Sequence, residues 1–298
     1  MTYAHFNAPA VSAPTISSAS MLVELSISVW TGRKKDKRAS DDVTYNNHAD
    51  VGVASVNKKL LGDCEELVAV QKFAANVRSG HYAMTMPWSD SGLRLLPTAQ
   101  FFKYNEQITA LRTEFDRLVE AFLAAYDWEV MQAQTKLGNL FIRDEYPTIE
   151  SLRDKFGFRI NYIPLPDAGD WRVNMENETK TALQTQYAAF YQNQMEGAMR
   201  DVWERLHEQV SRFIKQLDVD EEGKKGKIFQ STIDHVLSLT EMLGMANFTN
   251  DPNLSLAEAR LRAALRDVTQ SDLKNDEFLR EDTKRAMEQA IAALPSLM

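Results

Sequence analysis

The feature that most constrains this chain is an apolar stripe that recurs every three or four residues between Leu183 and Leu217. This spacing places the side chains on one face of an α-helix. The stripe predicts a helix over about 176–217, roughly 60 Å long. Its positions are Leu183, Tyr187, Phe190, Gln194, Ala198, Val202, Leu206, Val210, Phe213 and Leu217.

A second stripe predicts another long helix, over about 99–142, with Thr98 as its N-cap. Each of these rods has an apolar side that other protein must cover. We therefore expect the two helices to pair antiparallel, as a helical hairpin or coiled coil with small β elements at one end. The positions of the second stripe are Phe101, Ile108, Leu111, Phe115, Leu118, Phe122 and Tyr126.

Alternation of apolar and polar residues predicts the extended segments. Met21–Trp30 is expected to form a half-buried strand, and the Ser-Asp-Ser-Gly turn at Ser89–Gly92 predicts a β-hairpin. A strand over 158–166 that turns into Trp171 predicts a second hairpin.

Helices are expected in most of the remaining chain. Val51–Arg78 is predicted to be helical, and Thr148 is expected to cap a short helix over 149–156. After a charged Gly-Lys loop, three shorter helices are predicted, at about 229–247, 255–274 and 276–294.

The fold class is therefore mainly α, of the α+β kind, with a long helical hairpin, small β-hairpins and a C-terminal helical bundle. The expected divisions are a flexible N-terminal arm at 1–20, a strand, basic loop, helix and hairpin at 21–98, the helical hairpin at 99–222, and the C-terminal helices at 223–298.

Composition narrows the environment of the chain. A net charge of −8 argues against a surface that is basic throughout, but it leaves room for a local basic patch. The only cysteine, Cys64, forms no internal disulfide, which is typical of the cytoplasm, and an inert buried thiol is expected. No run of about 18 apolar residues occurs, so no membrane-spanning segment is expected.

Five cations in six residues follow the first strand: Arg33, Lys34, Lys35, Lys37 and Arg38. Such a loop is suited to phosphates, and the neighbouring Trp30 is suited to stacking on a base. The alternative is a solvated loop whose charges keep an edge strand from pairing with other chains.

Two candidate motifs are incomplete. A phosphate-binding P-loop needs four residues between its glycines, but only two separate Gly223 from Gly226, and no Ser or Thr follows Lys227. Glu204 and His207 have the spacing of a di-iron ligand pair, but no second copy of that spacing occurs. The sequence thus predicts no catalytic residue, no metal and no cofactor.

The aromatic stripe Tyr187, Phe190, Tyr191 and Trp203 of the predicted helix over 176–217 is expected first to be a core or helix-pairing seam. Where it exceeds what one partner helix covers, the excess predicts burial by self-association. The residues expected at this interface are Leu183, Tyr187, Phe190, Tyr191 and Trp203.

Three segments, LVELSISVWTGRKKDK, EYPTIESLRDKFGF and IPLPDAGDWRV, resemble phage and prophage proteins of the domain-of-unknown-function 3150 family. That family has no assigned activity, and its members are often encoded near MoxR-type AAA ATPases and von Willebrand A proteins. The resemblance implies a phage origin, a location in the host cytoplasm and an adaptor role toward such a partner. It implies no catalytic residues.

Two functions are predicted. The first is a non-enzymatic interaction or assembly protein that self-associates or acts as an adaptor, because the apolar stripes are long and no catalytic motif is complete. The second is a protein that binds or anneals single-stranded nucleic acid, with single-stranded DNA as a possible partner, through the basic loop 33–38 and Trp30.

Overall fold

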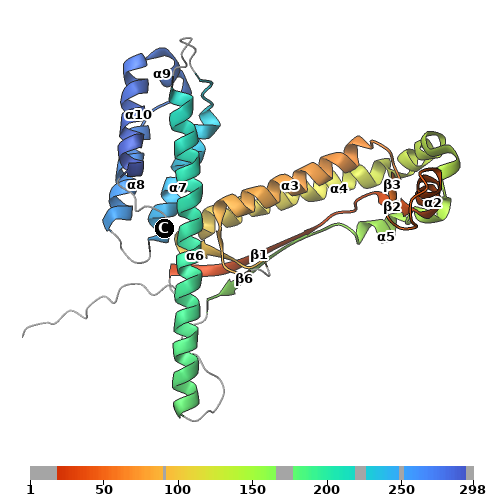
Figure 1. Cartoon of the computed structure of the whole chain (residues 1–298), viewed down its shortest axis with the longest axis horizontal. Helices are drawn as coiled ribbons and strands as arrows, with labels where there is room; N and C mark the ends of the chain where they lie inside the picture. The colour runs from red at the N-terminus through yellow and green to blue at the C-terminus, as the bar shows by residue number, and fades with distance from the viewer. Residues whose placement is uncertain (1–18, 90–91, 166–176, 219–225, 248–251, 293–298) are drawn as a thin grey trace, which may run out of the picture. The chain divides into compact units, whose positions relative to one another are not determined.

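The chain is mainly α-helical, with a small antiparallel sheet and a C-terminal helical bundle, as the sequence predicted (Figure 1). The computed structural model describes residues 19–89, 92–165, 177–218, 226–247 and 252–292. None of the helices within these ranges has a stretch long and apolar enough to cross a membrane.

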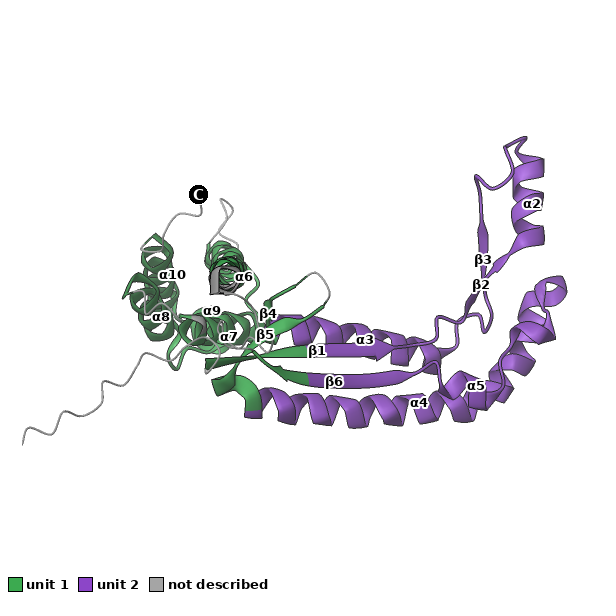
Figure 2. Ribbon diagram, turned by 90° about the horizontal axis from the view of Figure 1, so that it is seen from below, with its two compact units in different colours: residues 1–23, 84–101, 162–298 green, residues 24–83, 102–161 purple. Residues whose placement is uncertain are grey.

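The chain divides into two compact units, and each is built from separate stretches of sequence (Figure 2). Unit 1 comprises residues 1–23, 84–101 and 162–298, and unit 2 comprises residues 24–83 and 102–161. The units therefore interleave along the chain, unlike the consecutive divisions predicted from the sequence. Most of the predicted arm, residues 1–18, lies outside the described residues.

Four strands form an antiparallel sheet in the order β4-β5-β1-β6. In its register Ser20 lies opposite Pro97 and Met86 lies opposite Leu95. The amide of Ser89 donates to the carbonyl of Leu93 at 3.2 Å, which closes the predicted β4-β5 hairpin. The strands are β1 (Ser20–Ser28), β4 (Met86–Pro87), β5 (Arg94–Pro97) and β6 (Gly157–Pro164).

These strands confirm the predictions for 21–30 and for the first hairpin, and β6 confirms the strand before the second hairpin. The turn into Trp171 lies outside the described residues, so the second hairpin stays a prediction.

The helices of unit 2 follow its apolar stripes. The predicted stripe of α4 packs inward, and Phe115, Phe122 and Tyr126 are among its fully buried side chains. Thr148 caps α5 as predicted, with its hydroxyl accepting from the amide of Ser151 at 3.3 Å. Bounds are Glu65–Met84 for α3, Phe101–Leu137 for α4 and Ile149–Arg153 for α5.

Two predicted helix starts differ from the structure. The predicted helix over 51–78 is wrong in its first half, because Gly52 and Gly62 adopt positive φ angles of 93° and 63°, which a helix does not contain. Thr98 begins a 3-10 turn, Thr98–Gln100, and is not the N-cap of α4.

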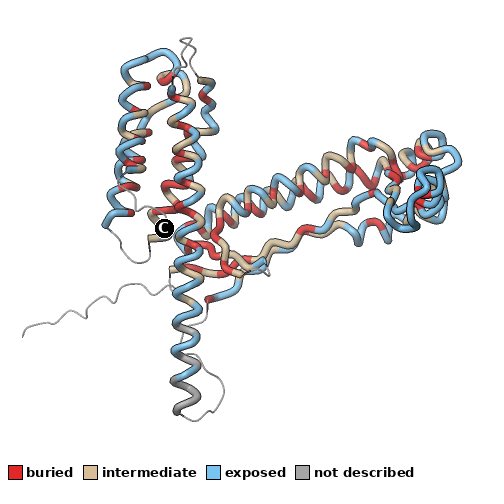
Figure 3. Tube along the Cα trace, in the orientation of Figure 1, coloured by how far each residue is buried: buried red, intermediate tan, exposed pale blue. Residues whose placement is uncertain are grey.

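A bundle of helices forms the C-terminal part of unit 1. α6 packs against α7 and α10, and α8 packs against the same two helices. The predicted stripe of α6 is buried from Ala198 to Leu217 (Figure 3). The bounds are Asn177–Leu217 for α6, Gln230–Ala246 for α7, Pro252–Leu265 for α8, Gln270–Asn275 for α9 and Glu277–Ala292 for α10.

Two predictions about these helices are corrected. The long helices α4 and α6 do not form the predicted helical hairpin, because α6 buries its stripe on α7 and α10 within unit 1, whereas α4 buries its stripe within unit 2. The helix predicted over 255–274 is two helices, since Asp267 has a φ of 58° and Thr269 starts α9 with a capping box.

Candidate functional site

The predicted basic loop is a strand and the start of a helix. β2 (Arg33–Asp36) pairs antiparallel with β3 (Val56–Lys59), and α2 (Lys37–Asn46) follows β2 directly. Asp36 ends the strand and caps the helix, because its carboxylate accepts from the amide of Ala39 at 3.0 Å. We call the strand pair β2-β3 the cationic ribbon.

One face of the cationic ribbon, which we call the inner face, carries the buried Lys58 and the 51% exposed Lys34, and carboxylates lie next to both. The ammonium of Lys58 lies 2.7 Å from a carboxylate oxygen of Glu145 and 3.1 Å from one of Asp36. It also donates to the carbonyl of Leu140 at 2.7 Å. Lys34, which lies opposite Lys58 in the register, has its ammonium 3.8 Å from Glu145.

These contacts shift two titrating groups. Burial acts to lower the pKa of Lys58, but hydrogen bonds to Glu145 and Asp36 outweigh it, so the pKa is raised. The hydrogen bond from the amide of Ala39, together with that from Lys58, lowers the pKa of Asp36. Both groups are therefore held in their charged forms.

The opposite face of the ribbon carries Arg33 and Lys35, because successive side chains of a strand alternate between its faces. Both are exposed, and Arg33 lies directly opposite Lys59. The ammonium of Lys59 pairs with Asp63 at 2.8 Å.

Lys37 and Arg38 are exposed in the first turn of α2, next to the ribbon. Within the part of the chain that the structure describes, neither they nor Arg33 and Lys35 form an ion pair. The structure thus keeps the five predicted cations together and leaves four of them without a carboxylate partner in that part.

Trp30 is not presented beside these cations as the sequence predicted. Its half-buried ring packs at centroid distances of 6.2 Å from Phe122 and 6.1 Å from Tyr126, and Gln71 donates to its carbonyl. The ring is a packing element of unit 2. Tyr45, near the end of α2, is an exposed aromatic residue of this region at 82%, and no sequence motif identified it.

The predicted interface residues of α6 have different surroundings. Trp203 is buried in the core of unit 1, so its assignment to an interface between chains is corrected. Tyr191 packs edge-on against Trp88 at 5.5 Å, and Phe190 stays 47% exposed. The side chains of Leu183 and Tyr187 lie outside the described residues.

The comparisons leave the family and the activity open: no protein-family model matches the sequence, no curated protein matches it, and no solved structure matches the chain. The resemblance to phage proteins stays a prediction that rests on the three quoted segments.

Proposed function

We propose that this protein binds single-stranded nucleic acid through the outer face of the cationic ribbon and the start of α2. The observation that carries the proposal is the difference between the two faces. Glu145 and Asp36 neutralise the inner cations, whereas Arg33 and Lys35 on the outer face have no carboxylate partner among the described residues.

The register places like charges opposite one another on both faces of the ribbon, which destabilises a strand pair. On the outer face Arg33 opposes Lys59, and Asp63 pairs with Lys59 only. On the inner face the corresponding pair, Lys34 and Lys58, is offset by Glu145. A phosphate backbone would offset the charges of Arg33 and Lys35, although the chain as a whole carries a charge of −8.

A single strand fits this surface better than a duplex does. Each strand of the ribbon is four residues long, or about 13 Å. This length is short for a surface that contacts the phosphate backbones of both strands of a double helix. Tyr45 offers an exposed ring at the other end of α2, and unpaired bases stack on such rings without regard to sequence. The alternative for these cations, protection of a strand edge, requires no ligand.

Fluorescence polarisation of a labelled oligothymidylate tests the proposal at several salt concentrations. We expect binding that weakens steeply with salt. Arg33→Gln combined with Lys35→Gln should lower the slope of log affinity against log salt by about 1.4, or about 0.7 for each contact with a single-stranded phosphate removed. A labelled duplex in parallel should bind less tightly.

The matched control neutralises Lys72 and Arg112, which are exposed on α3 and α4 of the same unit. Lys72→Gln with Arg112→Gln changes the net charge equally but leaves the ribbon intact. Equal losses in the two double variants, or no binding by the wild type at low salt, would refute the ribbon as the site.

A second proposal is assembly through α6, and Phe190 is the observation that favours it. Its ring is 47% exposed and meets Tyr191 edge-on at 6.0 Å, and among the described side chains of α6 the buried positions begin only at Ala198. A contiguous group of exposed apolar side chains marks a contact surface between proteins, and the sequence continues the predicted stripe beyond Phe190 with Tyr187 and Leu183. The partner that we propose for this face is a second copy of the chain.

Light scattering coupled to size exclusion measures this directly. We expect a dimer for the wild type and a monomer for Phe190→Ser, while Asn193→Ser, an exposed change on the same helix, should stay dimeric. A monomeric wild type at all concentrations contradicts the proposal. The family resemblance adds an adaptor role toward a MoxR-type AAA ATPase or a von Willebrand A protein, which a pull-down with each purified partner tests.

A further inference from the structure

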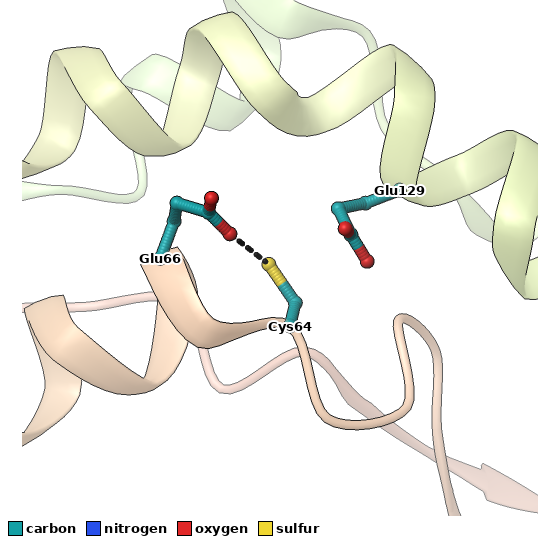
Figure 4. A group of neighbouring side chains, drawn as sticks. All are labelled: Cys64, Glu66 and Glu129. Atoms are coloured by element: carbon teal, nitrogen blue, oxygen red, sulfur yellow. Dashed lines mark hydrogen bonds between the residues drawn. The ribbon is translucent and has the colours of Figure 1, made fainter.

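Three side chains of unit 2 with metal-binding chemistry converge at the start of α3. Cys64 directly precedes this helix, Glu66 lies in its first turn, and Glu129 reaches the same place from α4 (Figure 4). The thiol sulfur and one carboxylate oxygen of each glutamate lie within 4.8 Å of one another. We infer that Cys64, Glu66 and Glu129 bind a divalent cation of the zinc class.

The donor set defines the class of ion. A thiolate favours zinc and similar borderline ions over magnesium or calcium, and carboxylates complete zinc sites with bonds of about 2.0–2.2 Å. Around a tetrahedral zinc ion with bonds of about 2.0–2.3 Å, the donor atoms lie about 3.3–3.7 Å apart. The three donor atoms, all within 4.8 Å of one another, therefore need to move together by up to about 1 Å to bind the ion. Three protein ligands leave the fourth tetrahedral position to water.

An unsatisfied atom points to the same ligand. One carboxylate oxygen of Glu129, Oε2, is buried and accepts no hydrogen bond in the described structure. The Glu129 side chain is 16% exposed, and it forms a long ion pair in which the ammonium of Lys136, on a side chain that is 50% exposed, lies 4.0 Å from this oxygen. A buried carboxylate oxygen without a donor is costly, and a bound cation would remove that cost.

The thiol is enclosed as well, since Cys64 is 3% exposed. Burial, with smaller contributions from the two glutamates, raises its pKa to about 11, and the protonated sulfur donates to Glu66 Oε2 at 3.5 Å. Binding of the cation forms a metal–sulfur bond and releases the thiol proton to solvent. The affinity should therefore rise with pH.

Cobalt(II) is the probe, because a cobalt–thiolate bond has a charge-transfer absorption in the near ultraviolet that no carboxylate gives. Titration of the full chain should produce this band with one equivalent of cobalt, and added zinc should abolish it. Cys64→Ser should lose the band. Glu129→Gln should weaken zinc binding about tenfold or more, since even outer-sphere partners of a metal ligand contribute that much.

Asp116→Asn is the matched control, because Asp116 is an exposed carboxylate on the same helix as Glu129. It should bind cobalt and zinc as the wild type does. Zinc should also raise the melting temperature of the wild type and of Asp116→Asn, but much less that of Glu129→Gln, because the ion joins α3 to α4 only in the folded state.

Either of two results would overturn the inference. One is the absence of the charge-transfer band in wild-type protein that retains its helical circular dichroism. The other is equal zinc affinity in Glu129→Gln and Asp116→Asn. In both cases Cys64 is a protonated thiol that only donates to Glu66. If Cys64→Ser does not fold, the zinc affinities of Glu129→Gln and Asp116→Asn still test the proposed site.

Discussion

Nε of Arg280, a residue of α10, donates to the carbonyl oxygen of Leu217 at 2.7 Å and so caps the last turn of α6. Its terminal nitrogen also donates to the carbonyls of Gln216, at 2.8 Å, and Asp218, at 3.2 Å. The last carbonyls of a helix have no partner within it, so a side chain from another helix supplies one here. Arg280 is 2% exposed, and this burial lowers its pKa.

Arg280→Leu should lower the free energy of unfolding by about 3 kcal/mol, because three carbonyl groups lose a buried donor at once. Chemical denaturation followed by circular dichroism measures the change. Arg285→Leu, an exposed arginine on the same helix, should change it by less than about 0.5 kcal/mol. Equal effects of the two changes would show that the contacts to α6 contribute nothing.

The charge of Asp36 should make stability depend on pH. Since its folded-state pKa is lowered, Asp36 stabilises the fold above its ordinary pKa of 3.8, and that contribution is lost as the pH falls through the lowered value. Asp36→Asn retains a capping side chain but no charge. The wild type should be more stable than this variant at neutral pH, and the difference should shrink below about pH 4. A difference that is constant from pH 7 to pH 3 contradicts this account.

Gly226→Ala should destabilise unit 1. An added Cβ would lie 2.5 Å from the carbonyl oxygen of Gln216, which is backbone at the end of α6 and does not move aside as a side chain does. We expect a loss of about 1–3 kcal/mol, the usual range for overpacking. Thermal unfolding monitored by circular dichroism measures the change in stability. An unchanged melting temperature would contradict a clash between the added Cβ and the carbonyl oxygen of Gln216.

Gly197→Ala should have the opposite effect. This glycine lies inside α6, and a Cβ added there meets no atom within 4 Å. Alanine in a helix interior is favoured over glycine by about 0.5–1 kcal/mol, so the variant should unfold at a higher denaturant concentration. A lower midpoint would indicate that this face of α6 is covered in the folded protein.

Tyr45, and not Trp30, should contribute to binding of oligothymidylate. Tyr45→Ser removes an exposed ring and should weaken binding by about 1 kcal/mol, a factor of about five. Trp30→Phe should lower stability by about 1 kcal/mol but leave the affinity unchanged, because its ring packs on Phe122 and Tyr126. The reverse outcome would restore the role that the sequence predicted for Trp30.

The inner face of the cationic ribbon shows why part of the site was missed from the sequence. Buried strand positions are normally recognised as apolar, but here they are Asp36 and Lys58, whose burial is made tolerable by Glu145. Glu145 is far away along the chain. A segment of charged residues therefore has the appearance of a loop, although it contains a strand and the start of a helix.

The same reasoning applies to the metal-binding cluster. A single cysteine has no spacing motif to identify it, and Glu129 reaches Cys64 only because α3 and α4 lie together in unit 2 (Figure 4). Glu66 was within two residues of Cys64 in the sequence, but two adjacent ligands do not define a site.

The sequence alone determined where the long helices and most strands lie, because apolar periodicity and capping residues such as Thr148 act over a few neighbouring residues. Only the tertiary structure decided what each stripe packs against: α6 is covered by α7 and α10 and not by α4. It also decided which cations are neutralised and which carboxylates meet Cys64. Such contacts join residues that are distant in the sequence, so local sequence patterns do not predict them.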